Sequence, residues 1–286
     1  MHRLKINLIK VERVLSPTQI SIAPFVINPY RGCSYGCLYC YSKYNKVFRT
    51  RNKIWGSFLD IKFNIYEVLK KELSLFKPKR VLLGSTTEVF LPQEKRYRLT
   101  YRVLKILNRF KIPYTILTRS PHLINYIDLI KENSLNKIYF TVNFLDFNHK
   151  RLFEPFIDYD LESLCNTFRL LKKNNIKFRI HISPYLGELI DIKEIVKIFR
   201  EFTDEFFLEV YNPVLGSWDL VKKVIKVNFP NFYEKIIQNF QTQESYGNFC
   251  KKIQKEIAEL SSQYDIKFSY LFPEYKRFYT SDILYE

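Results

Sequence analysis

The sequence predicts an α/β fold in which parallel strands and helices alternate around a short barrel. Six apolar segments have the length of buried strands, and a segment with helical spacing of its apolar residues follows them in turn. Such alternation requires crossover connections, which place the strands parallel in one sheet. Six units are too few for the eightfold barrel. We therefore expect a barrel core at about residues 25–215, within one domain that spans residues 1–286.

The expected strands are short and rich in aliphatic and aromatic residues. They comprise Phe25–Tyr30, Arg80–Gly84, Tyr114–Thr118, Lys137–Asn143, Lys177–Ser183 and Glu205–Tyr211. The helices expected between them comprise Ser57–Phe76, Glu94–Phe110, His122–Lys131, Leu161–Asn174 and Ile192–Glu201. Ser120-Pro121 is typical of a helix start, and Asp160 is expected to cap the helix that follows it.

The two ends of the chain are expected to differ from the barrel core. Residues 1–25 contain Pro17 and Pro24 and predict an irregular lead-in. Residues 216–286 predict a mostly helical extension with one strand at Lys267–Phe272.

Composition narrows the class of protein. Hydrophobic residues make up 47% of the chain, enough for a large core. The sequence lacks an apolar run long enough for a transmembrane helix and lacks a secretory signal, so we expect a cytoplasmic protein without a membrane partner. We also expect a monomer. Three of the five cysteines lie within eight residues, which favours a metal site over a disulfide framework.

The net charge of +17 is unevenly distributed, because residues 1–56 contain ten Lys and Arg against the single acid Glu12. Residues 41–56 combine five basic with four aromatic residues and contain no acid. Basic residues can follow phosphates and aromatics can stack on bases, so a nucleic-acid partner is one interpretation. A lysine-rich genomic bias and a solvated flap packed on the barrel are the alternatives.

The segment Asn28–Tyr41, NPYRGCSYGCLYCY, carries the most specific pattern. Its C-x3-C-x2-C spacing offers three thiolates to an iron–sulfur cubane and leaves the fourth iron open to an outside ligand. Electron-transfer ferredoxins usually close that position with a fourth cysteine. A zinc site would need Cys165, Cys250 or a distant histidine as its fourth ligand. Gly32 and Gly36 allow the backbone to wrap tightly around a cluster.

This segment resembles the signature of the radical S-adenosylmethionine (SAM) superfamily, and its flanking residues resemble the branch related to spore photoproduct lyase. Further matches follow in the order expected of that branch. They are Asp60-Ile61-Lys62-Phe63-Asn64, Gly84-Ser85-Thr86-Thr87-Glu88, Leu117-Thr118-Arg119-Ser120, Phe153-Glu154-Pro155 and His181-Ile182-Ser183-Pro184.

The resemblance implies a partial (β/α)6 barrel of the TIM type, with the cluster and SAM at the carboxyl ends of the strands. It implies that Cys33, Cys37 and Cys40 hold a [4Fe–4S] cluster whose open iron binds SAM. An electron from a donor such as flavodoxin or ferredoxin would then cleave SAM to a 5′-deoxyadenosyl radical, which abstracts hydrogen from an unknown substrate.

The resemblance also implies roles for residues around SAM. Tyr39 would lie near the adenine, and Tyr41 would be a second aromatic beside the pocket and a candidate hydrogen donor. Ser85 and Thr86 would bind the amino group of SAM, and Arg119 its carboxylate. Three further residues at strand ends are expected to meet the ribose or carboxylate. They are Thr141, Asn143 and Ser183. His181 is expected to be a hydrogen-bonded barrel residue instead of a proton shuttle.

One departure from the lyase makes repair of the thymine photoproduct doubtful, and a second leaves the role of Glu88 open. The family's cysteine at the end of the second strand is missing from VLLGSTTE, and the residues around Glu88 differ from the family's Asp-Pro-Tyr. The expected function is therefore a radical SAM enzyme of unknown substrate, a DNA or RNA lesion or base being one substrate class. The alternative is a non-catalytic iron–sulfur or zinc protein that binds nucleic acid.

Overall fold

The computed structural model describes residues 4–44, 54–215 and 217–275. Most of the basic and aromatic segment at residues 41–56 lies outside these ranges. The chain divides into two compact units. Unit 1 comprises residues 1–36, 45–141 and 156–178, and unit 2 comprises residues 37–44, 142–155 and 179–286. The expected single domain stays a prediction.

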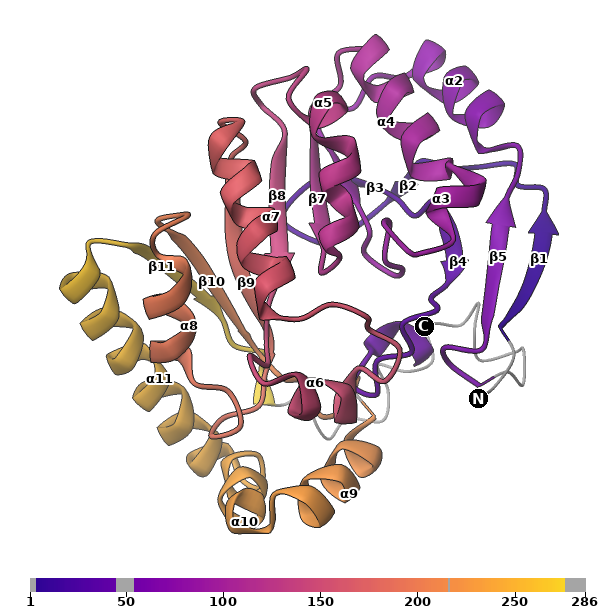
Figure 1. The fold of residues 1–286 in the computed structure, drawn as a ribbon. Coiled ribbons are helices and arrows are strands. Elements are labelled where there is room, and N and C mark those ends of the chain that lie inside the picture. The colour runs from indigo at the N-terminus through magenta and orange to yellow at the C-terminus, as the bar shows by residue number, and fades with distance from the viewer. Residues whose placement is uncertain (1–3, 45–53, 216, 276–286) are drawn as a thin grey trace. The chain divides into compact units, whose positions relative to one another are not determined.

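The larger sheet of unit 1 is mainly parallel (Figure 1). Its strands, in spatial order, are β2 (Ser16–Pro17), β3 (Phe25–Ile27), β6 (Val81–Leu83), β7 (Tyr114–Thr118) and β8 (Lys137–Thr141). The pairs β3–β6, β6–β7 and β7–β8 are parallel, and only the short β2 runs antiparallel to its neighbour. The chain order of β3, β6, β7 and β8 equals their spatial order, as expected for successive crossover units.

A second, three-stranded sheet in unit 1 corrects two predictions. The lead-in is not wholly irregular, because β1 (Lys5–Ile9) pairs in parallel with β5 (Phe58–Lys62), and β4 (Tyr30–Gly32) pairs antiparallel with β5. The helix expected from Ser57 begins only at Ile65, since Phe58–Lys62 is this central strand. Its first four side chains are all buried, and Asp60 accepts a hydrogen bond from the Asn7 amide at 2.8 Å. A strand covered on both faces has no alternation that would distinguish it from a buried helix.

The strand expected at Phe25–Tyr30 is also divided. Residues Phe25–Ile27 belong to the larger sheet, and Tyr30–Gly32 belong to the smaller one. The change of sheet falls at Asn28-Pro29, where proline lacks the N–H that a central strand would donate.

The helices of unit 1 lie along the outside of the larger sheet (Figure 1). They are α2 (Ile65–Leu75), α3 (Glu94–Tyr97), α4 (Leu99–Arg109), the 3-10 helix η2 (Pro121–Tyr126), α5 (Ile127–Ile130) and α7 (Leu161–Lys173). Asp160 caps α7 by accepting from the Ser163 backbone N–H at 2.9 Å, which confirms the predicted start.

The helix expected at Glu94–Phe110 is broken at Arg98, which has a left-handed φ of 51°. The break lets the buried Glu94 carboxylate accept from the Thr100 and Tyr101 backbone N–H groups, at 3.1 and 3.0 Å. The Glu94 carboxylate also accepts hydrogen bonds from the hydroxyls of Tyr30 and Tyr126. One buried side chain thus satisfies the first turn of α4.

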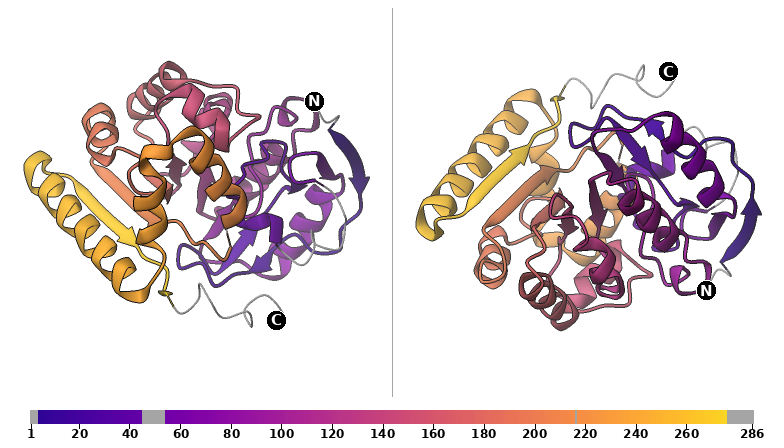
Figure 2. Two further views of the ribbon diagram at one scale, coloured as in Figure 1. Left: turned by 90° about the horizontal axis from the view of Figure 1, so that it is seen from below. Right: turned by 90° about the horizontal axis from the view of Figure 1, so that it is seen from above.

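Unit 2 contains a parallel sheet with its own helical cover. The strands, in spatial order, are β9 (Phe178–Tyr185), β10 (Glu205–Val210) and β11 (Lys267–Leu271). The helices are η1 (Tyr41–Tyr44), α6 (Phe147–Phe153), α8 (Ile192–Phe199), α9 (Trp218–Asn228), α10 (Pro230–Asn239) and α11 (Gln243–Tyr264). Figure 2 shows α11 running alongside β11. The described part of the extension is therefore mostly helical with one strand, as predicted.

Both units have the mixed α/β architecture of parallel strands joined by helices, as the strand–helix alternation predicts. None of the helices in the three described ranges is long and apolar enough to cross a bilayer.

We expect Glu94→Ala to lower the free energy of unfolding by about 3 kcal/mol, because buried donors that lose their only acceptor keep their full desolvation cost. Denaturant unfolding measures the loss. Glu234→Ala, at an exposed position on α10, is the control and should change the free energy of unfolding by less than about 0.5 kcal/mol. Equal losses in the two variants would contradict the role given to Glu94.

Candidate functional site

The cysteine loop begins in unit 1 directly after β4. Cys33 is buried, and the preceding Gly32 has a positive φ of 87°. The Thr87 hydroxyl donates to the Gly32 carbonyl at 2.6 Å and so joins the loop to the residues after β6. Gly36 also has a positive φ, and a Cβ there would lie 2.9 Å from the Phe156 ring. Glycine is required at both positions for the chain to follow this path.

The loop continues in unit 2 with the other two cysteines of the pattern. The Cys40 backbone N–H donates to the Cys37 carbonyl at 3.2 Å, so the x2 spacing forms a tight turn. The Leu38 N–H donates to the Phe153 carbonyl at 2.8 Å and anchors this turn to the end of α6. Cys37 is buried and Cys40 partly exposed, whereas the Tyr41 side chain is 46% exposed.

Three thiols on a glycine-containing loop form a donor set that fits three corners of a [4Fe–4S] cubane. Across the described residues, no three His, Cys, Asp or Glu side chains are grouped closely enough to hold a metal ion. Ligation by Cys33, Cys37 and Cys40 together therefore stays a prediction from their spacing and chemistry.

Asn28 organises the turn after β6 in unit 1. Its side-chain NH2 group donates to the Ser85 hydroxyl at 3.1 Å, and its side-chain oxygen accepts from the Thr86 backbone N–H at 3.0 Å. Its own backbone carbonyl accepts from the Lys62 ammonium at 2.6 Å. Burial and the nearby Arg31 lower the pKa of Lys62 to about 8. The two residues predicted for the SAM amino group are thus held in one turn by an amide that the sequence did not single out.

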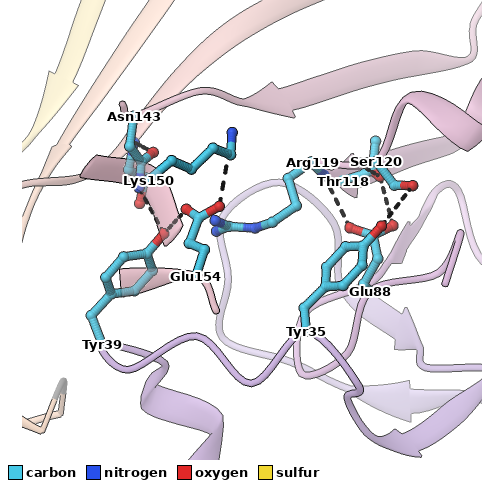
Figure 3. Close-up of polar contacts among 10 residues, drawn as sticks. Tyr35, Tyr39, Glu88, Thr118, Arg119, Ser120, Asn143, Lys150 and Glu154 are labelled. Atoms are coloured by element: carbon cyan, nitrogen blue, oxygen red, sulfur yellow. Dashed lines mark hydrogen bonds and ion pairs between the residues drawn. The ribbon is translucent and has the colours of Figure 1, made fainter. Parts of the chain in front are cut away.

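Glu88 holds the turn after β7 in place in the same way. Its carboxylate accepts from the Thr118 hydroxyl at 2.6 Å and from the backbone N–H groups of Arg119 at 3.0 Å and Phe90 at 2.8 Å (Figure 3). Burial raises the pKa of Glu88, although these three donors favour the charged form. The backbone of Arg119 is therefore fixed while its side chain remains partly exposed.

The cysteine loop is joined to this same turn through Tyr35. The Tyr35 hydroxyl donates to Ser120 Oγ at 3.0 Å, and Ser120 Oγ donates to the Phe90 carbonyl at 2.9 Å (Figure 3). Both side chains are buried. Unit 1 thus contains a continuous polar path from the loop that carries Cys33 to the turn that carries Arg119. Thr141, which ends β8, is also buried in this unit.

A buried polar network surrounds Tyr39 in unit 2. The Tyr39 hydroxyl donates to the Glu154 carboxylate and accepts from the Asn143 amide at 2.9 Å (Figure 3). Lys150 Nζ lies 3.9 Å from the second oxygen of Glu154, and both side chains are almost completely buried. A buried charge pair of this kind is tolerated only with good partners, so the network holds the Tyr39 ring in one orientation.

Asn143 extends this network to the middle of β9. Its side-chain oxygen accepts from the Ser183 N–H at 3.3 Å, and the Ser183 hydroxyl donates to Glu209 Oε2 at 3.1 Å. The same oxygen lies 3.3 Å from His181 Nε2. Partial burial works against the charged form, but His181 and Ser183 hold the pKa of Glu209 below its ordinary value. His181 is buried in the strand, and its expected hydrogen bonding stays a prediction.

The structure thus brings the predicted residues together in two groups. Ser85, Thr86 and Arg119 lie at strand ends of unit 1, and Tyr39, Asn143 and Ser183 share one network in unit 2. Four residues that organise these groups were not predicted as site residues. They are Asn28, Glu88, Lys150 and Glu209. Asn28 directly follows β3, a position that is also common in ordinary turns. Glu88 lies in the loop after β6, Lys150 within α6 and Glu209 within β10, so no shared sequence signal marked them.

Comparison with known proteins decides the family. The profile of the radical SAM superfamily matches residues 27–202. The chain belongs to the radical SAM superfamily. An uncharacterised protein of Methanocaldococcus jannaschii is 31% identical over 237 residues, which cover 83% of this chain and 88% of the relative. An uncharacterised protein of Mycobacterium tuberculosis is also 31% identical, over 114 residues that cover 38% of this chain and 33% of that protein.

Solved structures of spore photoproduct lyase share the fold of this radical SAM enzyme. A mutant of the lyase has a TM-score of 0.63 at 14% identity, and the match covers 94% of this chain and 82% of the lyase. A form of the lyase with bound AdoMet and a dinucleoside spore photoproduct matches with a TM-score of 0.62 at 13% identity. The predicted fold class is therefore confirmed, and the family model confirms the predicted superfamily. Radical SAM enzymes use a [4Fe–4S] cluster and SAM, so the predicted cofactors are confirmed by family membership.

Glu88→Gln removes a carboxyl whose pKa is raised by folding, and it should change how stability depends on pH. Below the ordinary value of 4.5 the folded and unfolded states of the wild type are both protonated. As pH rises from there to the raised pKa, only the unfolded state releases its proton. The wild type should therefore lose stability relative to the variant, by at most about 1.4 kcal/mol per pH unit.

Anaerobic denaturant unfolding at a series of pH values measures this difference. Glu132→Gln, at an exposed loop position of the same unit, is the matched control and should leave the pH dependence unchanged. If the free energies of unfolding of the wild type and Glu88→Gln differed by the same amount at every pH in this range, the effect assigned to burial of Glu88 would be contradicted.

Proposed function

We propose that Cys33, Cys37 and Cys40 hold the [4Fe–4S] cluster of this radical SAM enzyme and that the enzyme abstracts a hydrogen atom from an organic substrate. The observation that carries the proposal is the C-x3-C-x2-C loop, with two of its cysteines buried and its glycines at positive φ, within a chain of this superfamily. When bound, the reduced cluster and SAM supply the 5′-deoxyadenosyl radical for this step.

The chain's own residues bind and orient SAM. The turn that contains Ser85 and Thr86 offers a hydroxyl and carbonyl oxygens that suit an ammonium, and Asn28 keeps this turn in place. Arg119 offers a guanidinium that can pair with a carboxylate through two parallel hydrogen bonds. Because Glu88 fixes the Arg119 backbone, only side-chain freedom is lost when the ligand binds.

Unit 2 carries aromatic and polar groups whose chemistry suits the adenine and ribose of SAM. Tyr39 presents its ring to the adenine, and its hydroxyl is already occupied by Glu154 and Asn143, so the ring needs no rearrangement on binding. Ser183 offers a partly exposed hydroxyl beside Glu209 for the ribose or carboxylate. Thr141 is proposed to contribute from the end of β8. Tyr41 is exposed enough to act as a hydrogen donor beside the pocket.

The remaining partners are inferred from chemistry. The cluster requires one electron per cleavage, which a small redox protein such as flavodoxin or ferredoxin supplies. A monomer in the reducing cytoplasm would keep a three-thiolate site intact. The lyase that shares this fold was solved with a dinucleoside photoproduct, which supports a nucleic-acid lesion or base as a substrate class to test first.

Three single variants, Cys33→Ala, Cys37→Ala and Cys40→Ala, should each abolish 5′-deoxyadenosine formation and lose most of the bound iron and sulfide, since each of the three thiolates would hold one iron of the cubane. Cys165→Ala on α7 and Cys250→Ala on α11 are matched controls and should keep both. The assay is anaerobic reconstitution, iron and sulfide analysis, and product detection after reduction with SAM. A variant of the first group with full iron and sulfide would refute its ligand role.

The alternative of a non-catalytic protein is tested by the same assay. Fully reconstituted wild type that binds nucleic acid but forms no 5′-deoxyadenosine would support that alternative and contradict the proposed function.

Arg119→Met should weaken SAM binding about tenfold to hundredfold, the effect of losing a charged hydrogen-bonded pair. Equilibrium binding of SAM to the reconstituted enzyme measures it. Arg151→Met, at an exposed position on α6, is the control and should leave the SAM affinity unchanged. Equal affinity in the two variants would remove Arg119 from the SAM site.

A further inference from the structure

The outer face of α4 carries a continuous row of positive charge in unit 1. Arg98, Arg102, Lys105 and Arg109 follow one another at intervals of four, three and four residues, and all four are exposed. Helical spacing places Arg102, Lys105 and Arg109 along one side of the helix, opposite the buried Thr100, Leu104 and Leu107. Arg98 directly precedes the helix. We name these four residues the α4 basic stripe.

Within the described residues, acidic side chains do not neutralise the positive charges of the stripe. No carboxylate of the described residues forms an ion pair with any of its four members, and the only acid of residues 94–111 is the buried Glu94. Like charges four residues apart destabilise a helix, and Arg98 and Arg102 also lie near the N-terminus of α4, where cations are unfavourable. A row that opposes the stability of its own helix is expected to have a binding role.

Genomic lysine bias does not explain the stripe. The whole chain contains 16 arginines among its 46 basic residues, yet four of the 16 lie within residues 95–111, together with three lysines. The planar guanidinium of arginine can donate two parallel hydrogen bonds to two oxygens of one phosphate.

An aromatic ring orients two of the stripe side chains. The Arg98 guanidinium lies 4.0 Å from the centroid of the Tyr101 ring, and Lys105 Nζ lies 5.5 Å from the same centroid. These cation–π contacts hold both cations over the helix surface and lower the entropy that binding would otherwise cost.

The neighbouring helix widens the charged surface. Figure 1 shows α2 and α4 side by side on the outside of unit 1. Lys70 and Lys71 are exposed on α2, and Lys77 Nζ lies 6.0 Å from the centroid of Phe110, directly after α4. A surface of this kind fits an extended polyanion better than a small anion.

We propose that the α4 basic stripe binds the phosphate backbone of a nucleic acid. Arg98 to Arg109 span about 16 Å at the rise of an α-helix, which equals about five phosphates along one strand. No large apolar side chain of residues 94–111 is exposed, whereas a helix that binds an anionic membrane needs an apolar face toward the lipid. Such contacts supply affinity without base specificity. This binding does not depend on SAM cleavage.

The experiment measures binding of fluorescently labelled 20-nucleotide DNA and RNA, single-stranded and duplex, to reconstituted enzyme across a salt series. The test variant combines Arg98→Gln, Arg102→Gln, Lys105→Gln and Arg109→Gln. The matched control removes four exposed charges of unit 2, with Lys223→Gln, Lys226→Gln, Lys251→Gln and Lys255→Gln. Far-UV circular dichroism and iron content verify that each variant is folded.

We expect the stripe variant to bind at least about tenfold more weakly at low salt than the wild type and to reduce the slope of log affinity against log salt by about 3. The control should change the affinity less than about threefold. Equal losses in both variants, or no wild-type binding at low salt, would overturn the proposal. Binding to phosphatidylserine vesicles without binding to nucleic acid would also overturn it.

Arg102→Glu alone keeps the test decisive if the fourfold variant fails to fold. It should weaken nucleic-acid binding more than Lys223→Glu does, and equal effects would overturn the proposal. Because neither measurement uses SAM, a failure here leaves the proposed catalytic function unaffected, and the reverse also holds.

Discussion

The backbone groups freed at the ends of parallel strands impose the constraint on which the site depends. A strand that ends inside the fold leaves N–H groups that need partners. In unit 1, Asn28 accepts from Thr86 and Glu88 accepts from Arg119, and in unit 2, Asn143 accepts from Ser183. In the first two cases a side chain from another element satisfies a turn, and in the third it satisfies a backbone group within β9.

This arrangement has an energetic cost, because it places carboxylates where water cannot solvate them. Glu88 and Glu94 are both buried with raised pKa values, and Glu154 is buried beside Lys150. Each is compatible with folding because it accepts at least one charge-assisted hydrogen bond from a buried donor. The rigidity gained is useful for chemistry that must exclude water and hold reactants in one geometry. The polar interior is therefore better explained by positioning than by stability.

The sequence predicted those parts of the fold that depend on local patterns. The six strands of the barrel core and the cap at Asp160 follow from periodicity and capping chemistry, and the cysteine loop from its spacing. The strand Phe58–Lys62 was missed because burial on both faces removes its alternation. The break at Arg98 was missed because it is imposed by Glu94 through hydrogen bonds with Tyr30 and Tyr126, which are distant in sequence. The roles of Asn28 and Glu88 likewise depend on long-range contacts that no spacing rule contains.

The exposed charge and the internal polar groups of unit 1 belong to different residues. Residues 216–286 carry a net charge of only +1, so nearly all of the +17 belongs to the rest of the chain. In unit 1 the exposed α4 basic stripe lies on the outer side of its helix, while the polar groups after β6 and β7 are held by internal hydrogen bonds. Exposed cations attract a polyanion over a distance but are screened by salt, whereas buried groups act at contact and are not. The two kinds of group therefore differ in how strongly salt weakens their interactions.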